Sequence, residues 1–193
     1  MSDYVCHSGG CPGADMAWEL AGREYSVHTI AYSFHNHKQD GANPKILSHS
    51  ELHEGYAAAQ RADKTLKRYF DNIQYPYIKN LLARNWFQIK NSEAVFAIGW
   101  MKKQPNIVDG GTGWAVQMAI DSDKPAYVYV QNDSSMLVGR KGQWVRWMVN
   151  HFEPIDYVPK LTKNFAGIGS RDLTDDGMQA ILDVYKNTFE YAA

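Results

Sequence analysis

The sequence predicts an α/β fold in which a mainly parallel sheet is covered by helices on both faces. Short runs rich in β-branched and aromatic residues alternate along the chain with segments of helical periodicity. Most of the short runs are almost continuously apolar, which is typical of strands that are buried on both sides. Small residues, glycine above all, lie at several of the junctions between strands and helices. The alternation predicts a doubly wound arrangement.

The local pattern predicts each element in turn. Strands are expected over Asp3–His7, Ser26–Tyr32, Glu93–Gly99, Pro125–Val130 and Asn164–Ile168. Helices are expected over Ala14–Ala21, Glu54–Phe70, Tyr77–Lys90, Thr112–Ile120 and Leu173–Phe189. The last helix has the clearest pattern, because its apolar residues recur at helical spacing and form one stripe.

Two stretches interrupt this alternation. Residues 33–53 are rich in His, Asn, Gly and Ser, and residues 131–163 carry Trp144, Trp147 and Phe152 among turn residues. Neither stretch has the pattern of a separate core, so both are expected to be excursions from a single domain that spans residues 1–193. The aromatic residues of the second stretch are expected to cover one side of a ligand cleft or a subunit interface.

The composition excludes several classes of protein. The 193 residues are 45% hydrophobic, which is enough for one sizeable core. The 20 Lys and Arg nearly balance the 21 Asp and Glu, so bulk charge does not predict a nucleic-acid or membrane partner. No apolar run approaches the roughly 20 residues of a membrane span. The polar start of the chain does not resemble a secretory signal, and Cys6 and Cys11 are expected to be reduced, so a cytoplasmic location is expected.

Glycine-rich turns are the main functional signal. One follows the first strand, another precedes the fourth helix, and the last follows the final strand. Glycine lets a ligand approach the backbone, and the following helix N-terminus offers free N–H groups and partial positive charge. Because the carboxyl ends of parallel strands meet at one sheet edge, the turns are expected to form one anion-binding cleft. The predicted ligand-binding residues of these turns are Ser8, Gly9, Gly10, Gly13, Gly110, Gly111, Thr112, Gly113, Trp114, Gly169, Ser170 and Arg171.

Other side chains are predicted to complete the cleft. Arg84 is expected either to clamp a phosphate with its planar guanidinium or to be an ordinary surface charge of its helix. Asn85 is expected to bind the backbone of a nearby turn. Asp15 suits a ribose diol, is the candidate catalytic acid, and has the alternative role of a helix cap. Trp114 is expected either to stack on a base or to lie in the core.

No metal site and no cofactor are expected. The histidines at 35, 37, 49 and 53 have ligand-like spacing, but no cysteine joins them. Solvated loop histidines are therefore the expectation for these positions. His7 ends the first strand, and it is expected either to reach the cleft or to be buried with its hydrogen bonds satisfied.

Several ordered motifs resemble those of one known family. They are SGGCPGAD at 8–15, LLARNW at 81–86, AVFAIG at 94–99, GGTGWAVQMAI at 110–120 and GIGSRDLTDDG at 167–177. The first looks like the second glycine motif of YpsA-type proteins, and the last looks like the motif that opens them. The chain therefore resembles the circularly permuted YpsA-related SLOG family, whose superfamily includes the LOG, or lysine decarboxylase-like, proteins and the DNA-processing protein DprA. The resemblance implies a permuted Rossmann-like domain that forms a homo-oligomer.

The resemblance also bears on chemistry. LOG enzymes cleave the N-glycosidic bond of nucleoside 5′-monophosphates and carry a PGGxGTxxE motif with a preceding arginine, which Arg84 matches in position. Asp109, Trp114 and Gln117 depart from that motif. A neutral glutamine does not stabilise positive charge on a sugar as a carboxylate does, so the LOG mechanism is not expected here.

Three functional hypotheses follow. The first is binding, without turnover, of a nucleotide-derived small molecule with phosphate and ribose, such as an ADP-ribose-like or cyclic nucleotide signal, by a sensor or sequestering protein. The second is a hydrolase of an N-glycosidic or phosphate-ester bond of a nucleotide, a LOG-like phosphoribohydrolase included, with a relocated acid such as Asp15. The third is a single-strand nucleic-acid-binding module that uses the basic stretch of Lys64, Lys67 and Arg68, which the near-neutral net charge disfavours.

Overall fold

The structure is a computed structural model that describes residues 2–102, 106–131 and 142–190. Its strands form one sheet with the order β3-β2-β1-β8-β4-β5-β6-β7. The strands are β1 (Val5–Ser8), β2 (His28–Ser33), β3 (Pro44–Ile46), β4 (Ala94–Gly99), β5 (Ala126–Val130), β6 (Gln143–Trp147), β7 (Phe152–Pro154) and β8 (Asn164–Gly169). The strands from β3 to β5 are parallel, and β6 and β7 add an antiparallel hairpin at one edge. The α/β class and the mainly parallel sheet are as predicted.

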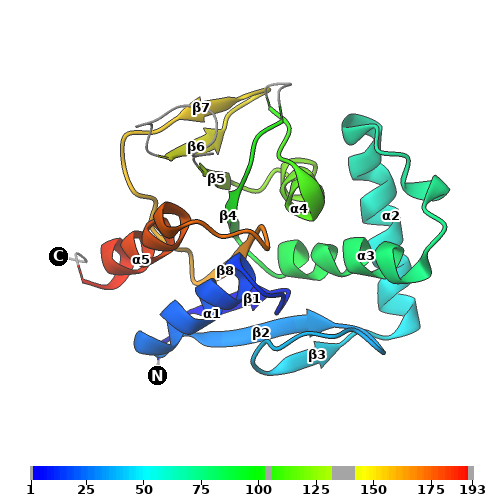
Figure 1. Cartoon of the computed structure of the whole chain (residues 1–193), viewed down its shortest axis with the longest axis horizontal. Helices are drawn as coiled ribbons and strands as arrows, with labels where there is room; N and C mark the ends of the chain where they lie inside the picture. Colours follow the sequence, from blue (N-terminus) through cyan, green and yellow to red (C-terminus); the bar gives the residue numbers. More distant parts are fainter. Residues whose placement is uncertain (1, 103–105, 132–141, 191–193) are drawn as a thin grey trace.

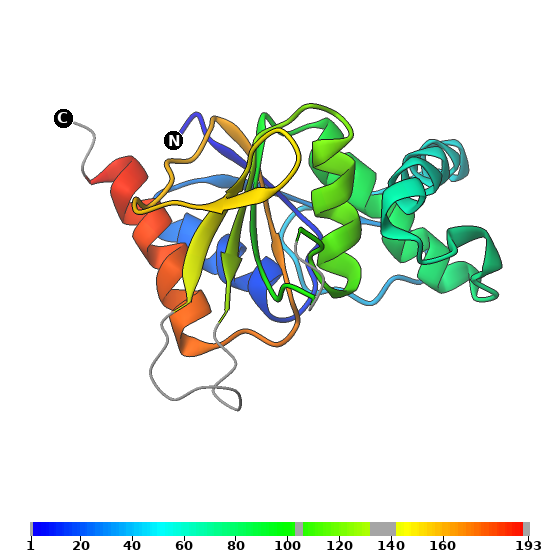
Figure 2. The same cartoon turned by 90° about the horizontal axis from the view of Figure 1, so that it is seen from above.

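Helices cover both faces of this sheet. They are α1 (Ala14–Glu24), α2 (His49–Leu66), α3 (Pro76–Lys90), α4 (Gly110–Ile120) and α5 (Asp175–Phe189), with a short 3-10 helix over Phe70–Asn72. Helices α1 and α5 are in contact and lie on the same side of the sheet (Figure 1). Helices α2, α3 and α4 gather on the opposite side (Figure 2).

Strand β4 explains why continuous apolar runs predicted the sheet. All of its residues are buried. Phe96 and Ile98 belong to the core under α1 and α5, whereas Val95 and Ala97 belong to the core under α2 and α4. Successive side chains of a strand point to opposite faces, so a strand covered on both faces needs an apolar residue at every position.

Residues 33–53 contain more regular structure than the sequence predicted. Strand β3 lies here at the sheet edge with all of its side chains exposed, so it lacks the apolar run by which the other strands were found. Helix α2 begins at His49 instead of 54, because Ser48 and Glu51 cap it. Each side chain accepts from the other's backbone N–H, at 3.2 Å and 2.7 Å. His49 and His53 therefore lie on a helix and not in a loop.

Helix α2 also ends earlier than expected, at Leu66 instead of Phe70. Lys67 adopts the left-handed conformation with φ 52°. The carboxylate of Asp63 then accepts hydrogen bonds from the backbone N–H groups of Arg68 (2.7 Å) and Phe70 (2.9 Å). These bonds replace the continuation of the helix and turn the chain back toward α4.

The second excursion adds strands β6 and β7 to the sheet. Trp144 packs against Tyr129, with ring centroids 5.5 Å apart, and Trp147 packs against Phe152 at 5.0 Å. None of these aromatic side chains lines the cavity between the glycine turns, so the first alternative, that they cover one side of the ligand cleft, is wrong. The second alternative, a subunit interface, stays a prediction. Residues 132–141 of this excursion lie outside the described residues.

The last helix ends beside the first strand. Tyr4, which precedes β1, meets Phe189 at the end of α5 with ring centroids 4.8 Å apart. Strand β8, which leads into α5, is itself paired with β1. The end of α5 therefore lies close to the start of β1, as it would in a chain that ran directly from α5 into β1.

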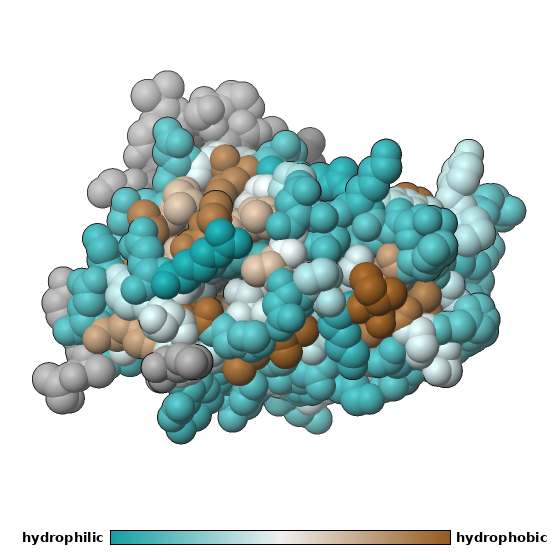
Figure 3. All heavy atoms as spheres, turned by 90° about the horizontal axis from the view of Figure 1, so that it is seen from below, coloured by the Kyte–Doolittle hydropathy of each residue, from teal (hydrophilic) through white to brown (hydrophobic). Residues whose placement is uncertain are grey.

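The surface offers few signs of partners. Among the described residues, none of the helices has the length and apolar character that crossing a membrane requires. Within the same residues, no group of three or more His, Cys, Asp or Glu side chains is arranged to hold a metal ion. On the face in Figure 3, apolar side chains form separate groups among hydrophilic ones. The homo-oligomer implied by the resemblance stays a prediction.

A rearranged chain tests the closeness of the two ends. It starts at Tyr157, runs through Ala193, continues over a short Gly-Ser linker into Met1 and ends at Asp156. The order of strands in the sheet is unchanged, so we expect a cooperative thermal transition within a few degrees of the natural chain, measured by circular dichroism.

The matched control uses the same linker but opens the chain between Phe96 and Ala97, inside the buried strand β4. This chain should not fold cooperatively. Loss of the transition in the first rearranged chain as well would contradict the inferred proximity.

Candidate functional site

A cavity of about 500 Å³ opens at the carboxyl ends of the parallel strands. Residues from all three glycine turns contribute to its wall, together with one side of α3. The turns therefore meet at one place, as parallel strand topology predicts. The predicted site residues that line the cavity are Asp15, Arg84, Asn85, Gly110, Gly111, Thr112, Gly169, Ser170 and Arg171.

Asp15 joins the first turn to the third. Its carboxylate accepts hydrogen bonds from the backbone N–H of Cys11 (3.4 Å) and of Gly169 (3.1 Å). Gly13 allows the close approach of the two turns, because its φ of 94° disfavours other residues and a side chain there would collide with the backbone of Ser170 and Arg171. Asp15 thus has the structural role of a loop anchor and also faces the cavity.

Three other predicted residues of the first turn, Ser8, Gly9 and Gly10, support the turn but lie outside the cavity wall. Ser8 is fully buried and donates to the Glu19 carboxylate (2.6 Å), and its hydroxyl accepts from the backbone N–H of Gly10 (3.0 Å). Gly9 leaves room for the guanidinium of Arg84, which would collide with a side chain at that position. These residues shape the turn but do not line the cavity.

Arg84 is a buried cation on the α3 wall and not a surface charge. It is only 5% exposed, and it donates to Cys11 Sγ (3.1 Å) and Gln88 Oε1 (3.3 Å). Among the described residues, no group accepts a hydrogen bond from Arg84 Nε or Gln88 Nε2. Gln88 escaped the sequence analysis, although its place one helical turn after Arg84 put it on the same face.

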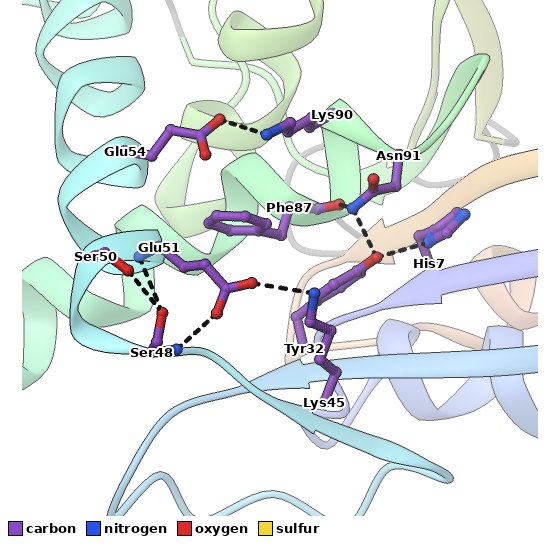
Figure 4. A network of polar contacts seen from close by, with 10 residues as sticks. All are labelled: His7, Tyr32, Lys45, Ser48, Ser50, Glu51, Glu54, Phe87, Lys90 and Asn91. Carbon is purple, nitrogen blue, oxygen red and sulfur yellow. Dashed lines mark hydrogen bonds and ion pairs between the residues drawn. The ribbon is translucent and has the colours of Figure 1, made fainter.

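Polar contacts hold α3 against the strands. Figure 4 shows Tyr32 at the centre of these contacts, where its hydroxyl meets His7 Nδ1 at 3.1 Å and accepts from Asn91 Nδ2 at 2.8 Å. Asn91 also donates to the Phe87 carbonyl and so closes the end of α3. His7 is therefore buried with its hydrogen bonds satisfied, and burial lowers its pKa below the ordinary value.

The N-terminus of α4 forms another part of the wall. Side chains added at Gly110 or Gly111 would meet no atom within 4 Å, so the backbone here faces open space. Asp109 does not cap the helix with its side chain, which leaves the first N–H groups of α4 without that acceptor. Asn85 Nδ2 donates to the Gly111 carbonyl at 3.3 Å, as expected for a residue that binds the turn backbone.

Gly113, Trp114 and Gln117 of α4 face away from the cavity. Trp114 is 4% exposed and packs edge-on against Phe70 at 5.8 Å, so the core alternative holds and base stacking does not. Gln117, which stands where LOG enzymes carry glutamate, donates to Asp121 at 2.8 Å along the same helix. The departure from the LOG motif at this position therefore does not leave a reactive group in the cavity.

The remaining wall is apolar. Ile78, Leu81 and Leu82 project from α3, and Trp100 follows β4. None of these four residues is among the predicted site residues, so this side of the site was not predicted. A flat ring can pack against such a wall while polar groups bind the turns opposite.

Burial and two guanidinium groups set the charges at the site. Burial raises the pKa of Asp15 to about 6, against the opposing effect of the Arg84 charge. Burial lowers the pKa of His37 to about 4, and the charges of Arg84 and Arg171 lower it further, so this imidazole is neutral at pH 7. Burial likewise raises the pKa of the Cys11 thiol. The fixed cations of the cavity are therefore arginines.

Comparison of the chain with protein-family models, with curated proteins and with solved structures yields no match.

The titration of Asp15 tests the balance between burial and the Arg84 charge. Because its folded pKa exceeds the ordinary value of 3.8, the contribution of Asp15 to stability is largest below pH 3.8 and declines as the pH rises to about 6. NMR of the carboxyl carbon should give a pKa of about 6 in the natural chain. In Arg84→Met it should be higher, because the opposing cation is gone.

Arg23→Met is the control. It removes an exposed arginine from α1, the helix that carries Asp15, but at the opposite end of that helix. This variant should leave the pKa of Asp15 unchanged. A titration of Asp15 near 3.8 in the natural chain would contradict the burial of the carboxylate.

Proposed function

We propose that this protein binds a nucleotide-derived small molecule that carries phosphate and ribose, such as an ADP-ribose-like compound or a cyclic nucleotide. It acts as a sensor or a sequestering protein for that molecule, and it self-associates as the family resemblance implies. One observation carries the proposal: the open N-terminus of α4 and the guanidinium groups of Arg84 and Arg171 line the same cavity.

The phosphate is the part of the ligand for which the support is strongest. A helix N-terminus presents N–H groups and partial positive charge to an anion, and α4 does so where Gly110 and Gly111 leave space. A guanidinium group donates two parallel hydrogen bonds to phosphate oxygens. Arg171, at the exposed rim, therefore offers the phosphate a second contact. The carboxylates of Asp15, Asp109 and Asp172 line the same cavity, so the support comes from these directed donors and not from an excess of positive charge.

The rest of the ligand has partners as well. Arg84 Nε and Gln88 Nε2 are buried donors without an acceptor among the described residues, and such an unmade bond costs about 1–3 kcal/mol. Oxygen atoms of a bound ligand would satisfy them. Asp15 retains lone pairs for ribose hydroxyls, and the apolar wall of α3 suits the face of a base.

We also infer that the chain is a circularly permuted member of the YpsA-related SLOG family. If the short edge strand β3 is left out and β8 is counted as the first strand, the order β2-β1-β8-β4-β5 reads 3-2-1-4-5, which follows the Rossmann order. The contact between Tyr4 and Phe189 supports the same inference, because it is where the unpermuted chain would run on.

Binding without turnover is favoured over hydrolysis by the LOG route. The residue at the position of the LOG glutamate is Gln117, whose amide is engaged by Asp121 on the far side of the helix from the cavity. A carboxylate is needed there to stabilise the positive charge that develops on the sugar.

Gly111→Val tests the binding site directly. The added side chain meets no protein atom within 4 Å of its Cβ, so the free energy of unfolding should change by less than about 1 kcal/mol. The same side chain occupies the space for a phosphate, so affinity for ADP-ribose should fall at least about tenfold, measured by calorimetry.

Ala57→Val is the matched control, because it places the same side chain on the exposed face of α2. It should bind ADP-ribose like the natural chain. Undiminished affinity in Gly111→Val, or a natural chain that binds no compound from a panel of ADP-ribose, cyclic nucleotides and nucleoside monophosphates, would overturn the proposal.

A nucleotide hydrolase remains the second candidate, since one observation favours it. Asp15 lines the cavity and its pKa is raised to about 6, so a fraction of it carries a proton near neutral pH, as a general acid must. This acid is a different one from the glutamate of LOG enzymes.

Release of free base from the same panel, followed by chromatography, tests the hydrolase. Any turnover should fall as the pH rises above about 6, because Asp15 then loses its proton. Asp15→Asn should reduce it at least about a hundredfold. Asp172→Asn, which alters an exposed carboxylate of the same cavity, should have little effect. Absence of both base release and phosphate-ester cleavage from every compound would exclude this candidate.

A further inference from the structure

Arg68 lies immediately behind the glycine turn that opens α4. The sequence places it in the basic stretch of Lys64, Lys67 and Arg68 on the helix predicted over 54–70, where a solvated face or a nucleic-acid contact is the expectation. Its guanidinium instead donates two hydrogen bonds to backbone carbonyls, from Nη1 to Gly110 and from Nη2 to Val108, each 2.7 Å long. This side chain does not line the cavity itself.

These hydrogen bonds determine which way the turn faces. The described chain has no cis peptide bond, and in a trans peptide the C=O and the following N–H point in opposite directions. Because the Gly110 carbonyl points to Arg68, the N–H of Gly111 points away from it. Asn85 donates to the Gly111 carbonyl, so by the same rule the N–H of Thr112 points away from Asn85. Both N–H groups belong to residues of the cavity wall.

Arg68 is itself held in place by its surroundings. Asp63 accepts from its backbone N–H at 2.7 Å, and Lys67 and Tyr69 on either side take left-handed conformations with φ 52° and 58°. The charge of Asp109 also lies near the guanidinium. A Cβ at Gly113 would collide with the Val108 carbonyl that Arg68 binds and would lie 3.1 Å from Arg68 Nη1. The last glycine of the GGTG segment thus accommodates the Val108 carbonyl first, and Arg68 beside it, and not a ligand.

We propose that Arg68 is a positioning residue of the anion-binding site. Its paired hydrogen bonds hold residues 108–111 so that the N–H groups of Gly111 and Thr112 face the ligand phosphate. The inference rests on the proposed function, since it assigns a role in phosphate binding. The planar fork is what the role requires, because a lysine carries the same charge but cannot hold two carbonyls in this fixed geometry.

The experiment compares Arg68→Met and Arg68→Lys with the natural chain. Kd values are measured for ADP-ribose and for adenosine, which lacks phosphate, and amide resonances of Gly111 and Thr112 are followed by NMR without ligand. Lys64→Met is the matched control, since it removes an exposed cation of the same basic stretch.

We expect Arg68→Met to raise the Kd for ADP-ribose at least about tenfold, as loss of a charge-assisted hydrogen bond does. The Kd for adenosine should change less than about twofold. Arg68→Lys should recover only part of this loss. In both variants the Gly111 and Thr112 amides should shift and exchange faster with solvent. Lys64→Met should match the natural chain in every measurement.

Several outcomes would overturn the inference. Full recovery by Arg68→Lys would show that charge alone matters, and equal losses for ADP-ribose and adenosine would indicate a merely structural role. If Arg68→Met does not fold, the same comparisons are made with Arg68→Lys, whose unchanged affinity and amide resonances would refute the role. If the natural chain binds none of the probes, the proposed function fails, and the amide resonances of the variants still decide whether Arg68 holds the turn.

Discussion

The arrangement of the cavity depends on the buried carboxylate of Asp15. It accepts hydrogen bonds from the first and the third glycine turn, and so it holds together two loops that follow neighbouring parallel strands. A carboxylate removed from water needs compensating partners, which are these backbone donors and the nearby Arg84 guanidinium. Arg84 in turn fits over the first turn only because Gly9 has no side chain. A single buried charge thereby links two turns to helix α3.

The cavity shows how a nearly neutral chain directs several anion-binding groups to one place. The helix dipole of α4 and the guanidinium groups of Arg84 and Arg171 act within one enclosed space, where the surrounding protein screens charge less than water does. The carboxylates of Asp15, Asp109 and Asp172 line the same cavity, so the direction of the donors and not the net charge distinguishes the site. A near-neutral net charge therefore disfavours a broad surface for binding a polyanion, but it does not indicate whether a small anion binds in a cavity.

Much of the fold could be predicted because its signals are local. The buried strands required continuous apolar runs, and the residues of the glycine turns follow those strands directly, so their meeting at one sheet edge was foreseeable. Trp114 was harder to assign. It is two residues after Thr112 in α4, and at about 100° of rotation per residue it reaches the core while Thr112 still faces the cavity. The rotation of α4 about its own axis decides which of its side chains face the cavity and which face the core. The sequence of one turn does not specify that rotation.

The sequence by itself determined the alternation of strands and helices, the burial of the sheet on both faces and the glycine turns at its carboxyl edge. Only the tertiary structure decided that Arg68 faces the turn before α4 and that Trp144 lies outside the cavity wall. The physical reason is one of range. Periodicity and turn chemistry act over a few neighbouring residues, whereas these contacts join segments far apart along the chain and arise only when the helices have packed onto the sheet.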